Sequence, residues 1–525
     1  MAMSTPAMNA PFVESVDAAT GEVLQRIPAT QLEDVSRVVA EARAAQPAWA
    51  AEEVRARCKL LRKLGDVLFA RRVEAASLIT RESGKPRVEA LFSDVFSALE
   101  TAKYFATNAP EMLRPERVPH HNLVAKAKTG WLRYEPYGVI GVISPWNYPL
   151  AIPLGEMIPA LVAGNAVVLK PSEWTPATGE FVRDCFRSAG FPAGLVGVLQ
   201  GGGAVGGALI AAGPDKVSFT GSVETGKRIA EACARSLIPS VLELGGKDAM
   251  IVLADANLET ASSAAVWGSF TNCGQACVSV ERIYVEEPAA EEFARFCVEK
   301  TRRLRVGPAS DPDAEIGPMI RVRQLERVEA QVRDAIERGA RVLTGGNRRP
   351  DLGPSFLEPA VVTGVNASMK LMQEETFGPV LAICSVRDAE EAVALANSSP
   401  FGLAASIWTR DVARAKIMAA RLRAGAVMIN DVASYYCISE APHGGRGASG
   451  WGRTHSRLGL MEMVQVKYVD VDRLPHWPKA WWYGYDASVS AAADRFVSFL
   501  CAPRWSSRLR NATGAARAAF RGHRI

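Results

Sequence analysis

Short runs of apolar residues alternate with longer stretches of helical periodicity between about residues 139 and 253. A bounded apolar run of roughly four to eight residues is typical of a buried strand, and apolar positions three or four apart indicate a helix. The alternation predicts a parallel α/β architecture. The predicted strands are Val139–Ser144, Ala166–Leu169, Leu195–Leu199, Lys216–Phe219 and Ala249–Leu253, and the predicted helices are Leu154–Val162, Thr178–Ala189 and Gly226–Cys233.

A second α/β unit is predicted to begin after about Lys247 and to run to about Ser449. Two further segments, Thr129–Glu135 and Val464–Val469, have an extended pattern but fit neither unit. With 525 residues, of which 48% are hydrophobic, the chain is long enough for two or three domains with sizeable cores.

The tail after Asp472 has a different composition. A proline-broken aromatic segment, Pro475–Tyr485, precedes a short amphipathic helix predicted at about Ala491–Cys501. Beyond that helix the chain has six arginines and no acidic residue: Arg504, Arg508, Arg510, Arg517, Arg521 and Arg524.

Composition argues against several classes of protein. The net charge of +5 is not accompanied by interleaved basic and aromatic residues in the body of the chain, so nucleic-acid binding is not expected. No stretch of about 18 apolar residues occurs, so no segment is expected to span a membrane. The N-terminal residues 1–11 lack a basic and an apolar signal region, so we expect no signal peptide and a cytoplasmic location.

Cysteine and histidine usage points to a reducing compartment without a metal centre. The nine cysteines form no CxxC pair, a pattern that indicates free thiols rather than a disulfide framework. Of the six histidines only His120 and His121 are adjacent, and none has zinc-ligand spacing. We therefore expect no metal.

Three segments carry candidate catalytic chemistry. Cys277 closes a Gly-Gln-Ala-Cys segment, Glu243 opens a Glu-Leu-Gly-Gly-Lys segment, and Asn147 is central in Pro-Trp-Asn-Tyr-Pro. A thiol, an amide and a carboxylate can serve as nucleophile, oxyanion donor and general base. Each residue alone also has a structural interpretation: a buried small hydrophobe, a turn-forming asparagine and a solvated surface glutamate.

In order and spacing, these motifs resemble those of the NAD(P)-dependent aldehyde dehydrogenase superfamily, from about Phe12 to about Val471. The resemblance implies that Cys277 attacks an aldehyde while the Asn147 side chain and the Cys277 backbone N–H stabilise the oxyanion. It also implies that Glu243 activates the water that hydrolyses the thioester. Members that pass the acyl group to coenzyme A generally lack this carboxylate, so a free carboxylic acid is the expected product.

The resemblance also implies the fold class: an α/β, aldehyde dehydrogenase-like fold with a Rossmann-type cofactor domain, an α/β catalytic domain and a β-strand oligomerisation arm. The arm implies a homodimer or homotetramer. We assign residues 1–122 and 138–247 to the NAD-binding domain, 248–449 to the catalytic domain, 123–137 and 460–472 to the arm, and 473–525 to a C-terminal extension.

Cofactor binding is expected at several strand ends and loops. The segment after Phe219 opens a helix, where backbone amides can hold a pyrophosphate. By resemblance, Lys170 binds ribose hydroxyls of the adenosine half, and Glu375 binds the nicotinamide ribose. The complete set of expected cofactor residues is Trp146, Lys170, Glu173, Gly221, Ser222, Glu375 and Phe377.

The expected cofactor is NAD rather than NADP. By resemblance, Glu173 faces the 2′-hydroxyl of the adenosine ribose, where a carboxylate accepts a hydroxyl and repels a phosphate. A Gly-x-Gly-x-x-Gly match at Gly201–Gly206 has no acid about twenty residues on in the expected context. We therefore do not interpret it as the dinucleotide fingerprint.

Two departures from the family pattern bear on the substrate. Gly155 replaces the bulky aromatic residue of many members, and His443 replaces the usual phenylalanine of the tunnel, which predicts a wider or more polar tunnel. No arginine pair for a substrate carboxylate is evident in the sequence. We expect an apolar aldehyde, aliphatic of medium to long chain or aromatic, and retain succinic semialdehyde as the alternative.

Two further hypotheses stay open. The chain could be a catalytically idle member kept as a binding or structural protein, although every expected chemical residue is present. The aromatic and arginine-rich tail would suit a peripheral contact with anionic lipid, and the alternatives are a solvated tail, a contact within the oligomer or nucleic-acid binding.

Overall fold

The computed structural model describes residues 11–122, 125–476, 479, 481–506, 508, 510 and 512. The chain divides into one unit of residues 1–113 and 135–465 and a second of residues 114–134 and 466–525. Trp477 of the predicted aromatic segment and the arginines 517, 521 and 524 lie outside the described residues.

A six-stranded sheet in the first unit has the strand order β17-β9-β8-β5-β6-β7 and is parallel except for β17. The chain runs outward from β5 through β6 and β7, then crosses to the other side of β5 for β8 and β9. Doubly wound sheets of this kind bind ligands at the carboxyl ends of their strands, beside the point of reversal. The strands are β5 (Val139–Ile143), β6 (Ala166–Lys170), β7 (Val196–Val198), β8 (Lys216–Thr220), β9 (Ser240–Glu243) and β17 (Gly450–Trp451).

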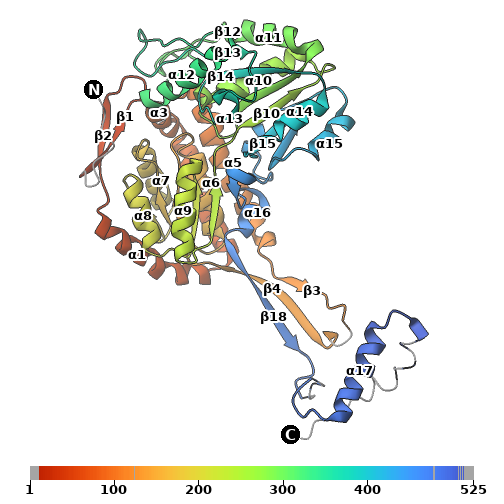
Figure 1. The fold of residues 1–525 in the computed structure, drawn as a ribbon. Coiled ribbons are helices and arrows are strands. Elements are labelled where there is room, and N and C mark those ends of the chain that lie inside the picture. Colours follow the sequence, from red (N-terminus) through yellow and green to blue (C-terminus); the bar gives the residue numbers. More distant parts are fainter. Residues whose placement is uncertain are drawn as a thin grey trace. The chain divides into compact units, whose positions relative to one another are not determined.

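Helices cover this sheet on both faces (Figure 1). Every residue of α6 is buried, as expected of a helix that is apolar all round. The covering helices that connect the strands are α6 (Ala151–Val162), α7 (Pro176–Ser188), α8 (Gly203–Ala211) and α9 (Val223–Arg235). The N-terminal elements are β1 (Phe12–Val16), β2 (Val23–Pro28), α1 (Leu32–Ala51), α2 (Val54–Ala70), α3 (Arg72–Ser83), α4 (Arg87–Glu89), the π-helix η1 (Ala90–Phe96) and α5 (Ser97–Met112).

A seven-stranded sheet in the same unit has the order β12-β13-β14-β11-β10-β15-β16 and is parallel except for β12. Its strands are β10 (Asp248–Val252), β11 (Val280–Glu286), β12 (Arg341–Thr344), β13 (Ala360–Thr363), β14 (Val380–Val386), β15 (Ala404–Trp408) and β16 (Ala426–Ile429). The associated helices are α10 (Leu258–Phe270), η3 (Thr271–Gly274), α11 (Glu287–Thr301), α12 (Val322–Glu337), α13 (Lys370–Gln373), α14 (Ala389–Ala396) and α15 (Val412–Ala419). Farther along are η4 (Ser434–Cys437), η5 (Gly447–Ser449) and α16 (Ser456–Met461).

The predicted α/β class is therefore confirmed. The five strands and three helices predicted between residues 139 and 253 are present, with ends displaced by a few residues at most. The proposed domain boundaries stay a prediction.

The second unit contains a three-stranded sheet, β18-β4-β3, and the helix α17 (Figure 1). Both predicted extended segments are strands, β4 (Lys128–Pro136) and β18 (Val464–Asp472). The sequence did not predict β3 (Glu116–Val118), which pairs antiparallel with β4. Helix α17 (Ala487–Cys501) begins earlier than predicted, because the Asp486 side chain caps the Val489 amide.

Candidate active site

The connection between the two sheets of the first unit determines where the candidate catalytic residues lie. Glu243 is the last residue of β9, and the short segment after it leads directly into β10. Cys277 and Glu375 each come a few residues before a strand of the second sheet, β11 and β14 respectively. The amino ends of these parallel strands share one edge, so the topology brings Glu243, Cys277 and Glu375 into one region.

Unusual backbone geometry holds the segment before Cys277. Asn272 and Cys273 have φ values of 52° and 55°, a left-handed conformation that is costly for residues other than glycine. Gly274 is also left-handed, and a Cβ there would clash with the carbonyl oxygen of Gly378. Strain of this kind persists where packing enforces it, so the turn fixes the direction in which the half-buried Cys277 points.

Asn147 lies against the same segment. Its side-chain amide donates to the carbonyl oxygen of Gln275 at 3.1 Å. Its own carbonyl oxygen accepts from Lys85 Nζ at 2.6 Å and from Asn272 Nδ2 at 3.0 Å. The turn that carries the predicted oxyanion donor is thus bonded directly to the segment that carries the predicted nucleophile.

Glu243 and Cys277 line one pocket, together with Glu156, Tyr436 and His443. Both carboxylate oxygens of Glu243 are buried and have no hydrogen-bond partner among the described residues. Burial, reinforced by the neighbouring Glu156 carboxyl, raises the pKa of Glu243 well above its usual value. A carboxyl group with a raised pKa in a buried pocket is suited to proton transfer near neutral pH.

The surroundings of Cys277 favour the neutral thiol. Burial raises its pKa, and the nearby carboxyl groups of Asp248, Glu375 and Glu243 raise it further. A base must therefore take the proton before the sulfur can act as a nucleophile. Cys273, by contrast, is buried in the hydrophobic core of the second sheet.

The expected residues for the adenosine half of the cofactor lie at carboxyl ends of the first sheet. Lys170 ends β6, and its Nζ is 3.3 Å from an Oε2 of Glu173. Gly221 and Ser222 follow β8, and Ser222 is the N-cap of α9, where its Oγ accepts from the Thr225 amide at 3.3 Å. A helix N-terminus near the point where the strand order reverses offers unpaired backbone amides to a phosphate.

The expected residues for the nicotinamide half lie near Cys277. The rings of Trp146 and Phe377 meet edge to face, with centroids 5.5 Å apart. The Oε1 of Glu375 accepts from the Gly246 amide at 3.0 Å, and a Cβ at Gly245 would clash with that carboxylate. Burial, with Glu281 nearby, raises the pKa of Glu375 to about 7.

Comparison with known proteins identifies the family. A model described as "Aldehyde dehydrogenase family" matches residues 6–469. A protein of Mycobacterium ulcerans named putative succinate-semialdehyde dehydrogenase (NADP(+)) 2 is 40% identical over 456 residues, covering 87% of this chain and 88% of that protein. The chain belongs to the aldehyde dehydrogenase family.

Two other similar aldehyde-processing proteins extend the comparison. The 4,4'-diapolycopene aldehyde oxidase of Methylomonas sp is 38% identical over 494 residues, 93% of this chain and 91% of that protein. The NAD+ complex structure of an aldehyde dehydrogenase from Bacillus cereus has a TM-score of 0.84 and 35% identity, covering 88% of this chain and 93% of that one. The aldehyde dehydrogenase fold predicted from the sequence is therefore confirmed.

A dinucleotide fits the residues that this aldehyde dehydrogenase presents. Glycine keeps the backbone open at Gly245, where a Cβ would clash with the Glu375 carboxylate. Lys170 and Ser222 supply a cation and a helix N-terminus at the carboxyl ends of β6 and β8, the two strands that flank β5. These residues would hold the two halves of an NAD(P) molecule.

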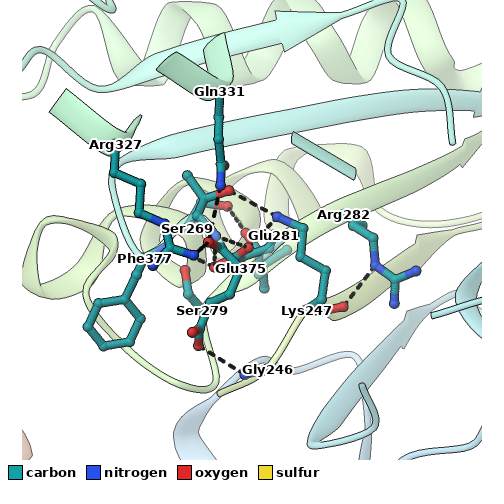
Figure 2. Close-up of polar contacts among 12 residues, drawn as sticks. Gly246, Lys247, Ser269, Ser279, Glu281, Arg282, Arg327, Gln331, Glu375 and Phe377 are labelled. Atoms are coloured by element: carbon teal, nitrogen blue, oxygen red, sulfur yellow. Dashed lines mark hydrogen bonds and ion pairs between the residues drawn. The ribbon is translucent and has the colours of Figure 1, made fainter. Parts of the chain in front are cut away.

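Sequence reasoning missed the polar network that holds the Glu375 loop (Figure 2). The buried Lys247 forms an ion pair with Glu281, and the Glu281 carboxylate also accepts from the Thr376 amide at 2.8 Å and the Phe377 amide at 3.1 Å. Arg327 and Gln331 donate to the carbonyl oxygen of Glu375 at 3.0 and 3.2 Å. The adjacent charges of Glu281 and Arg282, directly before the apolar run Ile283–Val285, were the available signal.

Two pocket residues were also missed. Glu156 is a lone acid in the apolar helix α6, which is a detectable signal, whereas His455 lies in a loop and gives none. A Cβ at Gly155 would lie 3.7 Å from His455 Cε1. The His455 ring therefore lies beside Gly155, the position from which the sequence analysis predicted a wider or more polar tunnel. The pocket is polar at this point.

Metal binding and membrane insertion find no support among the described residues. These residues contain no group of three or more histidine, cysteine, aspartate or glutamate side chains arranged to hold a metal ion. None of their helices has the length and apolar character needed to cross a membrane. All nine cysteines are unpaired thiols.

Proposed function

We propose that this aldehyde dehydrogenase oxidises an uncharged, largely apolar aldehyde to its carboxylic acid with NAD and water. Cys277 is the nucleophile, Asn147 the oxyanion donor and Glu243 the general base. The observation that carries the proposal is the pocket shared by the Cys277 thiol and the unpartnered Glu243 carboxyl.

The groups act in a fixed order. The Cys277 thiol loses its proton to solvent, the sulfur bonds to the aldehyde carbon, and the Asn147 amide donates to the resulting oxyanion. NAD, when bound, would supply the acceptor for the hydride of that carbon, and Cys277 would then hold the oxidised carbon as a thioester. Glu243 then removes a proton from water as the water attacks the thioester, and the thiolate of Cys277 leaves with release of the acid.

Charge in the pocket supports an uncharged substrate. None of the described lining residues is a lysine or arginine, and two of them, Glu156 and Glu243, carry carboxyl groups. Burial lowers the pKa of His443 to about 3 and that of His455 to about 4, so neither is a cation at neutral pH. A carboxylate on the substrate would find no cationic side chain among the described residues that line this pocket.

Succinic semialdehyde is the second candidate, because the 40% identical relative from Mycobacterium ulcerans carries its name. The relative from Methylomonas sp is instead named for 4,4'-diapolycopene aldehyde, which favours the first candidate. NADH formation with acetaldehyde, octanal, hexadecanal, benzaldehyde and succinic semialdehyde separates the two. A kcat/KM that rises with chain length supports the proposal, and a preference for succinic semialdehyde overturns it. If NAD binds but no aldehyde is oxidised, the chain is an idle member.

The choice of NAD rests on Glu173. Its carboxylate lies beside Lys170, at the strand end expected to meet the adenosine ribose, where it would repel a 2′-phosphate. The relative from Mycobacterium ulcerans is named for NADP, so each aldehyde in the panel is assayed with both cofactors.

Assembly and membrane contact form the remaining parts of the proposal. Exposed apolar side chains on β4 and β18, including Trp131, Val466 and Tyr468, favour burial in a homodimer or homotetramer, which sedimentation velocity would reveal.

The exposed Trp481 and Trp482 of the extension favour a peripheral contact with anionic lipid. Binding to phosphatidylserine vesicles that persists after deletion of residues 473–525 would exclude that contact.

A further inference from the structure

The segment from His443 to Thr454 folds back beside the strand that carries Glu243. His443 and Thr454 exchange two backbone hydrogen bonds, of 3.0 and 2.8 Å, and β17 within the segment pairs with β9. A Cβ at Gly444 would lie 2.8 Å from Glu243 Oε1, so only glycine there leaves room for the carboxyl group. The fold therefore sets the His443 side chain directly beside the proposed base.

The His443 ring is held on one side and faces Glu243 on the other. Its Nδ1 is 2.9 Å from the Tyr435 hydroxyl oxygen, and its Nε2 is 3.7 Å from Glu243 Oε2. The His443 and Glu243 side chains are each only 4% exposed. Tyr436 packs edge to face against the ring, with centroids 4.9 Å apart, and prevents the ring from turning away.

We propose that His443 is a positioning residue for the general base: the Tyr435 hydroxyl donates to Nδ1, and Nε2–H donates to the ionised Glu243 carboxylate. The inference rests on the proposed function of Glu243. A phenylalanine, which the family resemblance implies at this position, could not make this contact. Nε2 must approach by about 0.8 Å to reach hydrogen-bond distance, and catalytic hydrogen bonds commonly tighten this way once substrate binds.

The surroundings explain why the base needs a donor. Besides burial, the carboxyl groups of Glu156 and Glu462 raise the pKa of Glu243, and only Arg453 opposes them. An N–H donor that bonds the ionised form offsets part of this effect. Burial, with His455 and Arg453 nearby, lowers the pKa of His443 itself, so it acts as a neutral donor rather than as a cation.

The test compares His443→Phe with His443→Gln, because the glutamine amide can place an N–H near the position of Nε2. In His443→Phe the acidic limb of the kcat–pH profile moves to higher pH, and kcat at pH 7 falls about tenfold, the loss expected for one charge-assisted hydrogen bond. His443→Gln recovers most of that loss. His455→Phe is the matched control in the same pocket, and its acidic limb stays in place.

A cofactor-free readout separates this inference from the proposed function. 4-Nitrophenyl acetate acylates a reactive thiol without a hydride step, so nitrophenolate release reports acylation as a burst and hydrolysis of the acyl-enzyme as the steady state. We expect His443→Phe to retain the burst, to slow the steady state about tenfold and to accumulate acetyl-Cys277 by intact mass. An unmoved acidic limb, equal steady-state rates in wild type and His443→Phe, or no recovery in His443→Gln would overturn the inference. A wild type that hydrolyses the ester but oxidises no aldehyde would overturn the proposed function alone.

Discussion

Replacing Glu281 with glutamine should destabilise the protein more than any surface ion-pair variant. Glu281 is the anionic partner of the fully buried Lys247 and the acceptor for the amides of Thr376 and Phe377 (Figure 2). Glutamine has nearly the same shape but no charge, and its NH₂ group turns one acceptor into a donor that faces other donors. Lys247 is then a buried cation without an anion.

The expected loss in the free energy of unfolding is about 3–5 kcal/mol, the usual cost of removing one partner of a buried ion pair. This is an upper range, because Lys247 can lose its proton. Burial already lowers the pKa of Lys247, and Glu281 opposes this effect most strongly, with a smaller contribution from Glu375. In the variant without Glu281, Lys247 has a lower pKa in the folded state than in the unfolded state. At pH values between these two pKa values the folded state binds fewer protons than the unfolded state. The variant therefore regains stability as the pH rises toward the pKa of free lysine.

The assay is thermal unfolding at several pH values, with Glu329→Gln as the control. Glu329 pairs with Arg348 at the surface, with side chains 22% and 43% exposed, where such pairs contribute about 0–1 kcal/mol. Adding Lys247→Met to Glu281→Gln should restore much of the lost stability, since the unpaired charge is gone. If Glu281→Gln unfolds at the same temperature as Glu329→Gln, or if Lys247→Met restores nothing, the buried ion pair does not hold this loop.

Three further variants test the proposed chemistry. Cys277→Ala should abolish NADH formation while NAD still quenches tryptophan fluorescence; residual turnover above about 0.1% would assign the nucleophile elsewhere. Glu243→Gln should lower steady-state kcat about 100-fold yet leave an acyl-enzyme on Cys277 detectable by intact mass, and unchanged turnover would remove Glu243 from the role of base. Glu173→Gln should lower the KM for NADP about tenfold relative to that for NAD, because a repulsive charge beside the 2′-phosphate is lost. An unchanged ratio would show that Glu173 does not face the ribose.

Local patterns were sufficient for the elements that carry the candidate site. Strands β5 and β6 are buried at every position, so their apolar runs gave an unambiguous signal, and the polar motifs that follow each strand mark its carboxyl end. Because doubly wound sheets bind ligands at those ends, the positions of Asn147, Lys170 and Ser222 could be predicted before the topology was known.

The contacts that shape the pocket depend on pairings that no local pattern specifies. His455 stands beside Gly155 because α16 packs against α6, elements about 300 residues apart in the chain, and only the folded structure makes that contact visible. The same holds for the contact between His443 and Glu243, which depends on β17 pairing antiparallel with β9. The motifs therefore identified candidate reacting groups and placed His443 in the tunnel by resemblance, but they did not indicate that His443 and His455 contact Glu243 and Gly155.

This division has a physical reason. The thiol, amide and carboxylate are limited by chemistry to a few residue types in restricted backbone settings, so their motifs are recognisable from their order and spacing in the sequence. The identity of each surrounding residue depends on the others, because together they must fill the pocket volume and keep its buried charges compensated. Gly155 is compatible either with a wide tunnel or with a histidine side chain from a distant segment that fills the space. In the structure, the His455 ring fills it. We therefore predict that substitutions at His443 and His455, which reach the pocket through contacts to β9 and α6, change the kcat/KM ratio between octanal and benzaldehyde more than substitutions near Cys277 do.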